Sequence, residues 1–398
     1  MTIPRITYRN MNALSPSGSL PRVVIFRSAL LPMSETFVRE QAGALKCFEP
    51  VYAGLRWVSS GVPRSARNIL LISPDTRFAM LRTLLYQFNG YSPAFKSRIE
   101  EAQPLLIHAH FALDGIAALP LEEHLGIPLI VSLHGYDVTT SDNSLRTSVP
   151  GLLYLLRRRE LWTRVHTFLC VSEFIRSKAI EAGFPPNKLR VHYTGVNCEN
   201  FTCSDQPRDG SILFVGRLVQ KKGCEFLLNA MAEVHRTLPL ASLTIIGDGP
   251  LRRDLQAQAN RLDVPVRFLG ALPTIQVKGY MSRASIFCVP SLRADNGDSE
   301  GFGMVFAEAQ AIGTPVVSFS HGGIPEAVED GRTGLLVPER DTEALAAAMI
   351  RLLRDAELWH SFSVKGSERV RDDFSLEKQT RALEDIYLSV CAPRTRGK

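Results

Sequence analysis

The sequence contains no run of about eighteen consecutive apolar residues, which is the length that a membrane-spanning helix requires. We expect no secretory signal in residues 1–22, because they are polar, are interrupted by prolines and contain no apolar core. We therefore expect residues 1–20 to form a loose N-terminal leader. We expect a cytoplasmic protein and leave open a peripheral position on the inner face of the plasma membrane.

Cysteine patterns that would indicate disulfides or a metal site are also missing. The chain has seven cysteines, an odd number, and no C-x-x-C pair. The closest two, Cys198 and Cys203, have no histidine nearby at the spacing of a zinc site. We therefore interpret all seven as reduced thiols, as expected for a cytoplasmic protein.

Charge is unevenly distributed along the chain, although its total is modest. The net charge is +6, with 22 lysines and arginines against 16 aspartates and glutamates in residues 1–205, and 24 of each in residues 206–398. A basic first half suits an anionic acceptor or an acidic lipid surface. An unspecific bias of the surface explains the numbers equally well, so both interpretations stay open.

Near-continuous apolar runs that alternate with helical patterns predict an α/β fold, with parallel sheets covered by helices on both faces. The expected strands are residues 22–28, 51–57, 69–73, 105–111, 128–135, 167–172, 189–196, 211–216, 242–247, 266–270, 286–291, 315–319 and 334–338.

The length of 398 residues is enough for two domains that each have a hydrophobic core. Residues 199–210 are polar and contain glycine and proline, so they are the expected linker. We place the first domain at 21–203, the second at 204–373 and a final helical segment at 374–398.

One stretch, residues 295–317, carries the strongest functional signal. Within it, Glu300 precedes the glycine-rich turn Gly301-Phe302-Gly303, and Glu308 follows in a predicted helix. A helix that opens after a strand offers unpaired amides and a positive dipole end to an anion, and glycines let a ligand approach the backbone. Two carboxylates beside such an anion must face neutral groups, and sugar hydroxyls fit because they donate hydrogen bonds to carboxylates.

The sequence SEGFGMVFAEAQAIGTPVV, followed by GGIPE at 322–326, resembles the donor site of retaining glycosyltransferases of family four, which have the GT-B fold. The resemblance extends over most of residues 23–337. It implies two Rossmann-like domains that face each other across a cleft, with the acceptor on the first, the donor nucleotide on the second, and a final helix that crosses back to the first.

The resemblance also implies residue roles in the donor site. Glu308 would hold the ribose of a sugar nucleotide, and Glu300 would hold the sugar. The backbone after Glu300 would bind the sugar as well, through Gly301, Phe302, Gly303, Met304 and Val305.

Two cations are expected at the end of the strand at 211–216. Gly216-Arg217 ends that strand, and Lys221-Lys222 opens the next helix, an arrangement that suits a diphosphate. By resemblance, Gly216, Arg217 and Lys222 bind the donor diphosphate. We expect Lys221 to be solvated.

His134 is the candidate site residue of the first half. It follows a buried strand, and ligand-binding residues gather at the carboxyl ends of such strands. The resemblance places it near the donor sugar, opposite Glu300. The alternative is a structural histidine, but the motifs of the second half favour the site. For His108 and His110 we keep a position in the core or at the sheet edge.

No metal and no cofactor are expected. The charge that develops on the leaving diphosphate can be stabilised by Arg217, Lys222 and helix amides. The sequence has no D-x-D pair of the metal-binding kind, since Asp295 and Asp298 are three positions apart. It shows no protein nucleophile either, which agrees with the same-face attack that the resemblance implies.

Two segments of the first half have open interpretations. Residues 151–165 combine leucines with Arg157, Arg158 and Arg159, so they form either a membrane-surface helix or a helix that packs its leucines inward. Near the N-terminus, Ser34 is the expected helix cap, with contact of Ser34 or Thr36 to the donor phosphate or to the acceptor as the alternative.

The expected function is a retaining, metal-independent hexosyltransferase for cell-surface polysaccharide, such as lipopolysaccharide or exopolysaccharide. Its expected partners are a nucleotide-sugar donor, with UDP-sugar favoured and GDP-mannose as an alternative, and a glycan or polyprenyl-linked acceptor. An anionic membrane surface is a further candidate partner, and no nucleic acid is expected. The alternatives are a UDP-sugar 2-epimerase of the same fold and a non-catalytic sugar-nucleotide-binding protein.

Overall fold

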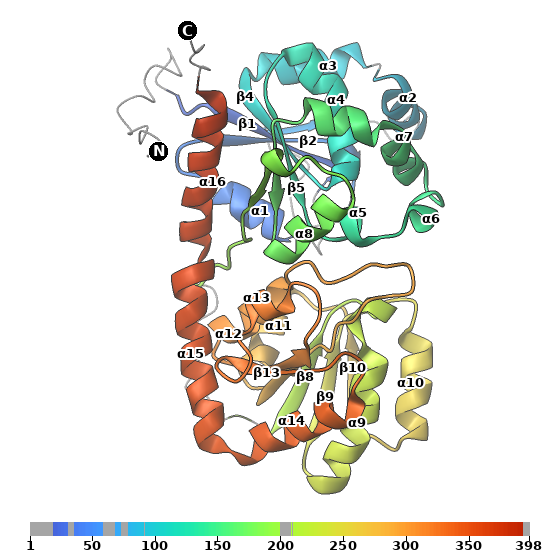
Figure 1. Ribbon diagram of the computed structural model, residues 1–398, viewed down its shortest axis with the longest axis vertical. Coiled ribbons are helices and arrows are strands. Elements are labelled where there is room, and N and C mark those ends of the chain that lie inside the picture. The colour runs from blue at the N-terminus through green and yellow to red at the C-terminus, as the bar shows by residue number, and fades with distance from the viewer. Residues whose placement is uncertain are drawn as a thin grey trace.

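The computed structural model describes residues 19–30, 36–58, 68–72, 79–90, 92–199, 208 and 210–392. These residues form two α/β lobes, one above the other, with a long pair of helices along one side (Figure 1). Each lobe is built on one sheet, and every strand pairing among the described residues is parallel. The expected fold of two parallel-sheet domains is confirmed.

The first sheet has seven strands in the order β3-β2-β1-β4-β5-β6-β7. They are β1 (Arg22–Leu30), β2 (Glu49–Trp57), β3 (Ile69–Leu71), β4 (Pro104–His110), β5 (Leu129–Leu133), β6 (Thr167–Cys170) and β7 (Leu189–Val191). The helices of this lobe are α1 (Thr36–Gly43), α2 (Ala79–Asn89), α3 (Pro93–Glu101), α4 (Ala112–Leu125), α5 (Tyr136–Thr139), α6 (Asp142–Leu145), α7 (Val149–Arg164) and α8 (Glu173–Glu181), with a 3-10 turn η3 (Pro186–Lys188).

The second sheet has six strands in the order β10-β9-β8-β11-β12-β13. They are β8 (Ser211–Val215), β9 (Ser242–Ile246), β10 (Val266–Gly270), β11 (Ile286–Cys288), β12 (Val316–Phe319) and β13 (Gly334–Val337). The helices that follow η4 (Gln220–Lys222), a 3-10 turn, are α9 (Cys224–Thr237), α10 (Arg252–Arg261), α11 (Thr274–Met281), α12 (Met304–Ala311), α13 (Ile324–Ala327), α14 (Thr342–Arg354), α15 (Ala356–Phe374) and α16 (Leu376–Cys391).

Both faces of the first sheet are apolar, which explains its continuous hydrophobic strands. Along β1, Val23 and Ile25 belong to one buried cluster, while Val24 and Phe26 belong to the other. Successive side chains of a strand point to opposite faces, so each face needs its own cover. One face is covered by α1 and by α16, the last helix of the chain.

The helix α16 joins the end of the chain to the first lobe. Tyr387 is fully buried there, and its hydroxyl lies 2.6 Å from Nδ1 of His108. Glu384 accepts hydrogen bonds from the amides of Lys46 and Cys47, at 2.7 and 2.5 Å. Where the chain passes from α15 to α16, Val196 and Ser375 form an isolated parallel bridge.

Each expected strand is present, but several end earlier than the apolar runs suggest. The strand β11 stops at Cys288 rather than at 291, because Pro290 has no N–H for a sheet and Ser291 turns back to Val289. Likewise, β7 ends at Val191 rather than at 196. The predictions for residues 1–18 of the leader, for Ser34 and for most of the linker concern residues outside the described part of the chain.

Candidate functional site

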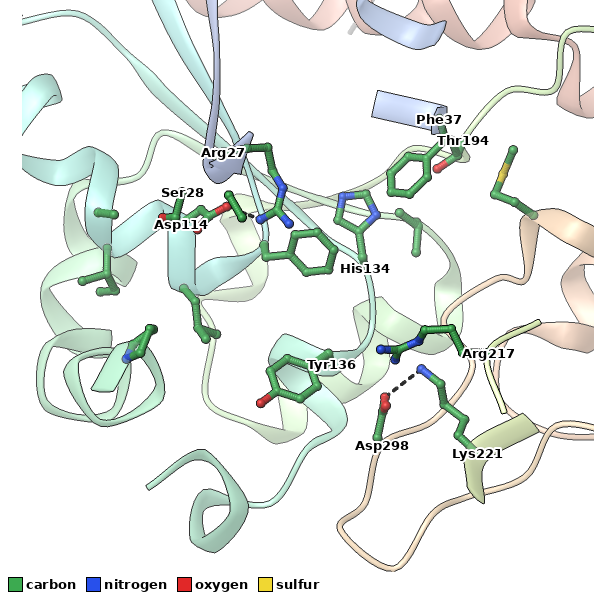
Figure 2. A pocket seen from close by; sticks show the side chains of 18 of the residues that line it. Arg27, Ser28, Phe37, Asp114, His134, Tyr136, Thr194, Arg217, Lys221 and Asp298 are labelled. Atoms are coloured by element: carbon green, nitrogen blue, oxygen red, sulfur yellow. Dashed lines mark hydrogen bonds and ion pairs between the residues drawn. The ribbon is translucent and has the colours of Figure 1, made fainter. Parts of the chain in front are cut away.

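A cleft of about 1130 Å³ lies between the two lobes and is lined by residues of both. Most of the candidate site residues line it: His134, Gly216, Arg217, Lys222, Glu300, Phe302, Gly303, Met304 and Val305. Gly301 and Glu308 are not among the lining residues. Figure 2 shows His134 on the wall formed by the first lobe, across from Arg217 on the second.

The best-defined contact of the cleft joins Lys222 to Glu300. The ammonium Nζ of Lys222, in η4, lies 2.5 Å from Oε2 of Glu300, which also accepts a hydrogen bond from Ser291 at 3.3 Å. Burial would raise the pKa of Glu300, but the charges of Lys222 and Lys221 and the hydrogen bonds lower it to about 2. Glu300 is therefore a carboxylate at neutral pH.

Lys221 differs from the expectation of a solvated side chain. Only 15% of its side chain is exposed, and its Nζ lies 3.0 Å from Oδ1 of Asp298 (Figure 2). The prediction was wrong because the loop at 295–300 folds over η4, so both successive lysines face carboxylates. Two ion pairs, Lys221–Asp298 and Lys222–Glu300, thus attach this loop to the turn after β8.

Arg217 follows β8 directly and is exposed to the cleft. Within the described part of the chain, its guanidinium makes no ion pair. Lys222 already has Glu300 as a partner, so Arg217 carries the unneutralised positive charge on this side of the cleft. A cation that is free and faces a cavity is available to an anionic ligand.

The N-terminus of α12 opens onto the same cleft. Gly303 caps this helix with a φ of +82°, and a Cβ at that position would lie 2.4 Å from the ring of Phe306. Met304 and Val305, the first two residues of the helix, line the cleft, and no helical carbonyl can reach their amides. The first turn of α12 has no acidic residue, so its dipole attracts an anion.

Glu308 lies in the second turn of α12 and is partly buried. Burial, reinforced by the charge of Glu40 on α1, raises the pKa of Glu308 to about 7, against the lowering effect of Lys278. Two carboxyl groups of one short segment thus differ widely in pKa: Glu300 is ionised at pH 7, whereas the pKa of Glu308 lies near pH 7.

His134 follows β5 and is enclosed by aromatic rings. Its ring centroid lies 5.1 Å from that of Phe37 and 4.6 Å from that of Phe111, and its Nε2 lies 3.1 Å from Nδ1 of His110. Burial, with the charge of Arg27 nearby, lowers the pKa of His134 to about 3. The imidazole is therefore neutral and can hydrogen-bond a hydroxyl but cannot serve as a cationic acid.

The structure separates the two histidines of β4. His108 is a core residue as expected, 1% exposed, with its ring nitrogens bonded to Tyr387 and Ser132. His110 is also buried, yet it contacts His134 and so supports the wall of the cleft. Strand alternation cannot show this contact, because it depends on the pairing of β4 with β5.

Sequence reasoning missed the ion pair between Arg27 and Asp114. The two side chains are mostly buried in the wall of the cleft formed by the first lobe, where Arg27 also lies over the ring of Phe111, 4.4 Å from its centroid. Phe111 has a φ of +73°, a strained value for a residue with a side chain. The available signal was a cation within the apolar strand RVVIFRS, since a buried charge needs a partner.

Asp137 was also missed, although it lies only three residues after His134. Its carboxylate accepts hydrogen bonds from the amides of Ala112, His134 and Gly135, at 3.0, 3.2 and 3.0 Å. Burial nevertheless raises the pKa of Asp137 to about 6. Asp137 therefore fixes the backbone that carries His134.

Two negative findings apply to the described residues only. They contain no group of three or more histidine, cysteine or acidic side chains that could hold a metal ion. They also include no helix that is both long and apolar enough to cross a membrane.

Comparison with solved structures identifies the two-lobed architecture. An Anabaena protein named HepE, crystallised with UDP and glucose, superposes with a TM-score of 0.72, covering 93% of this chain and 100% of that one at 17% identity. Sucrose-phosphate synthase from Thermosynechococcus elongatus gives a TM-score of 0.73 over 93% and 99% of the chains, at 22% identity. At these identities the likeness shows the fold.

Sequence comparison identifies the family. Residues 55–200 match the family model described as Glycosyltransferase Family 4, and residues 209–355 match the model described as Glycosyl transferases group 1. A Salmonella typhimurium protein named as a colanic acid biosynthesis glycosyltransferase is 31% identical over 71% of this chain and 70% of its own length. A GDP-mannose-dependent mannosyltransferase of Mycolicibacterium smegmatis is 31% identical over 67% and 72%. This chain therefore belongs to family four of the glycosyltransferases, with the GT-B fold.

Proposed function

We propose that this glycosyltransferase moves a hexose from a nucleoside diphosphate sugar to a glycan or lipid-linked acceptor in cell-surface polysaccharide assembly, with retention of anomeric configuration and without a metal. One observation carries the proposal. Arg217, Lys222, Glu300 and the N-terminus of α12 converge on one side of a cleft whose other side holds His134.

The donor fits this cleft by charge and by hydrogen bonding. The diphosphate would lie against Arg217, Lys222 and the amides of Met304 and Val305, which supply positive charge from side chains and from a helix terminus. Glu300, ionised and mostly buried, would accept hydrogen bonds from the sugar hydroxyls. Glu308 would hold the ribose.

The same groups would promote bond cleavage. When the bond between the anomeric carbon and the diphosphate oxygen breaks, its electron pair stays on that oxygen as negative charge. Arg217 and Lys222 would stabilise this charge as it develops, because both are in place before the step and need not rearrange. The acceptor hydroxyl would attack from the same face, and its proton would pass to an oxygen of the departing phosphate, so no protein nucleophile is needed.

The relatives give support to two donor bases. The mannosyltransferase of Mycolicibacterium smegmatis is named as GDP-mannose-dependent, whereas the Anabaena protein was crystallised with UDP. We favour a UDP-sugar and propose testing both. The Salmonella relative and an amylovoran biosynthesis glycosyltransferase of Erwinia amylovora, 36% identical over 48% of this chain, support a polysaccharide acceptor.

The proposal is tested by screening UDP- and GDP-sugars for thermal stabilisation and then for turnover in the presence of EDTA. Release of nucleoside diphosphate that depends on an added acceptor would support a transferase, and an α-linked product from an α-linked donor would support retention. Release of nucleotide without acceptor, together with an epimerised sugar, would instead indicate the 2-epimerase. No stabilisation by any nucleotide sugar would contradict the proposed function.

A further inference from the structure

The sequence GGIPE at 322–326 ends in a glutamate to which the mechanism above gives no role. Glu326 lies in α13 of the second lobe, but the hydrogen bonds of its carboxylate to described residues go to the first lobe. It accepts hydrogen bonds from the backbone amides of Glu173 and Phe174, both at 2.8 Å, and from the hydroxyl of Tyr193 at 2.9 Å. Figure 1 shows α8 and α13 facing each other where the lobes meet.

The two amides are the first two of α8, so the carboxylate caps this helix from the other lobe. The third amide, of Ile175, is bound by Ser172, the N-cap residue of α8, at 3.0 Å. Ser172 also donates its hydroxyl proton to the carbonyl of Gly301, at 2.6 Å. The N-terminus of α8 is therefore bonded to two parts of the second lobe: to α13 and to the donor loop, which we define as residues 300–303.

The turn before α13 is packed directly against the donor loop. The amide of Gly323 donates to the carbonyl of Glu300 at 3.0 Å. A Cβ at Gly322 would lie 2.4 Å from that same carbonyl oxygen, and a Cβ at Gly323 would lie 2.0 Å from the carbonyl oxygen of Gly301. Because only glycines fit, the turn and the loop are in contact along their backbones.

On its other side, the donor loop touches the first lobe at His134. A Cβ at Gly301 would lie 2.2 Å from the carbonyl oxygen of His134. Tyr193, the side-chain partner of Glu326, also packs on the loop, with its ring centroid 5.5 Å from that of Phe302. The position of the donor loop relative to His134 therefore depends on the contact that Glu326 makes.

Within its own lobe, Glu326 is anchored by its backbone. Arg369 of α15 donates to the carbonyls of Glu326 and Ala327, both at 2.8 Å. This holds α13 in place and leaves the carboxylate directed at α8. A negative charge is favoured there, because the N-terminal end of a helix dipole is positive.

We propose that Glu326 is a positioning residue that clasps the two lobes together and sets the donor loop against His134 for sugar transfer. The proposal rests on the proposed function. We call the hydrogen bonds of the Glu326 carboxylate to Glu173, Phe174 and Tyr193 the clasp. The proposal predicts that the clasp stabilises the closed, reacting state and leaves nucleotide binding to the second lobe nearly unchanged.

The test compares the wild type with Glu326→Gln, Glu326→Ala and Tyr193→Phe. Losing charge-assisted hydrogen bonds across the lobes is expected to lower kcat about tenfold in Glu326→Gln and more in Glu326→Ala. Tyr193→Phe keeps both amide bonds and should lose less. In all three variants the Kd of UDP, or of GDP if that is the nucleotide bound, should stay within about twofold of the wild-type value. None of the substitutions adds or removes a hydrogen bond to the nucleotide.

The matched control is Glu233→Gln, since Glu233 pairs with Arg236 on the exposed side of α9, inside the second lobe, and is expected to keep the wild-type kcat. Small-angle scattering gives a second readout that needs no turnover. Without any ligand, Glu326→Ala should have a larger radius of gyration than the wild type, because the hydrogen bonds of Glu326 join the two lobes.

Wild-type kcat in Glu326→Ala, or a ligand-free radius of gyration equal to that of the wild type, would overturn the clasp. Parallel losses of kcat, UDP affinity and unfolding temperature would overturn it as well, by showing that Glu326 supports only the fold. If the wild type itself turned over no nucleotide sugar, the proposed function would fail instead, while the scattering comparison would still decide the clasp.

Discussion

At the residue scale, the most informative contrast is between Glu300 and Glu308. The pKa of Glu300 is lowered to about 2 and that of Glu308 is raised to about 7, although both belong to one loop and helix. Glu300 has Lys222 as an immediate cation, whereas Glu308 has burial and the carboxylate of Glu40 as its main influences. Neither pKa can be read from the spacing of the two glutamates in the sequence.

Replacing Lys222 with alanine should lower kcat/KM for the donor about a hundredfold or more, because the developing charge on the diphosphate loses a preorganised cation. The variant should remain folded, and the pKa of Glu300 should rise once its nearest cation is gone. Steady-state kinetics measures the loss of activity, and thermal unfolding checks that the variant is folded. Arg253→Ala, at an exposed position of α10, is the control, and wild-type turnover in Lys222→Ala would contradict the site.

Glu308 predicts a dependence of donor affinity on pH. Ribose hydroxyls would donate hydrogen bonds to the carboxylate and so favour the charged form, which is only partly populated in the free protein near pH 7. We expect nucleotide affinity to rise between pH 6 and pH 8, with proton release on binding, and to become flat in Glu308→Gln. Calorimetric titrations at the two pH values provide the measurement, and equal slopes in both proteins would refute the ribose role.

The same group should affect stability with a definite sign. Because the folded-state pKa of Glu308 is raised from about 4.5 to about 7, the folded form binds the proton more tightly. Its contribution is fully present below about pH 4.5 and is lost as the pH rises through 7, on the order of 3 kcal/mol. The difference in unfolding free energy between the wild type and Glu308→Gln, measured across this pH range, should follow that course, and a constant difference would show that Glu308 is not shifted.

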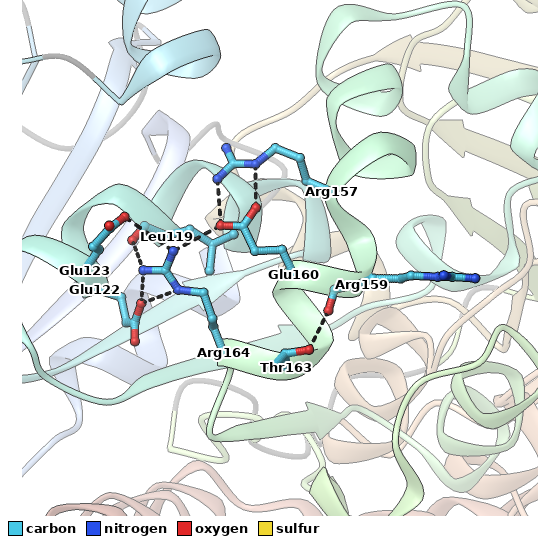
Figure 3. Close-up of polar contacts among 8 residues, drawn as sticks. All are labelled: Leu119, Glu122, Glu123, Arg157, Arg159, Glu160, Thr163 and Arg164. Atoms are coloured by element: carbon cyan, nitrogen blue, oxygen red, sulfur yellow. Dashed lines mark hydrogen bonds and ion pairs between the residues drawn. The ribbon is translucent and has the colours of Figure 1, made fainter.

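At the element scale, α7 changes the argument about membranes. Arg157 pairs with Glu160, Arg158 with Asp142, and Arg164 with Glu122, Glu123 and Glu160, as Figure 3 shows for the first and last of these arginines. The expected basic surface is thus largely neutralised by its own lobe. Three apolar residues of α7 are exposed: Leu156 is 72% exposed, and Leu152 and Val149 are each 43% exposed.

These three residues recur at helical spacing, and Val149 also lines the cleft. We therefore propose that α7, with the guanidinium of Arg159 beside it, rests on an anionic membrane near a lipid-linked acceptor. Leu152→Gln with Leu156→Gln should lower binding to vesicles containing anionic lipid about tenfold or more. Leu240→Gln, at a site 96% exposed in the second lobe, is the control. Equal vesicle binding by the wild type, the double variant and the control would contradict a membrane contact of α7.

At the scale of the whole molecule, the site is divided between two lobes, so a ligand that contacts both must favour their closed arrangement. A nucleotide sugar is expected to reduce the radius of gyration of the wild type in small-angle scattering. Lys222→Ala, which should bind the donor weakly, is the control at the same ligand concentration. Identical scattering curves with and without donor would contradict a shared site.

Most of the fold could be predicted from local sequence, because strands buried on both faces are continuous apolar runs, as in β1 and β5. The donor side of the cleft was also foreseeable, since Gly216 to Lys222 and Glu300 to Glu308 are short contiguous motifs. The contacts of His110 with His134, Arg27 with Asp114 and Glu326 with Phe174 were not. They join segments 24, 87 and 152 residues apart, and only the assembled sheets and lobes bring them together.

The cover of the first sheet by α16 has a consequence for synthesis of the protein in the cell. Leu383, Tyr387 and Val390 complete a cluster that includes Val23 and Ile25. One face of β1 is therefore fully covered only after α16, near the end of the chain, has been translated. Throughout elongation, this face of the nascent lobe is open to water or to a chaperone. A fragment that ends before α16 is therefore expected to aggregate and to give little soluble protein, even if it contains the whole sheet of the first lobe.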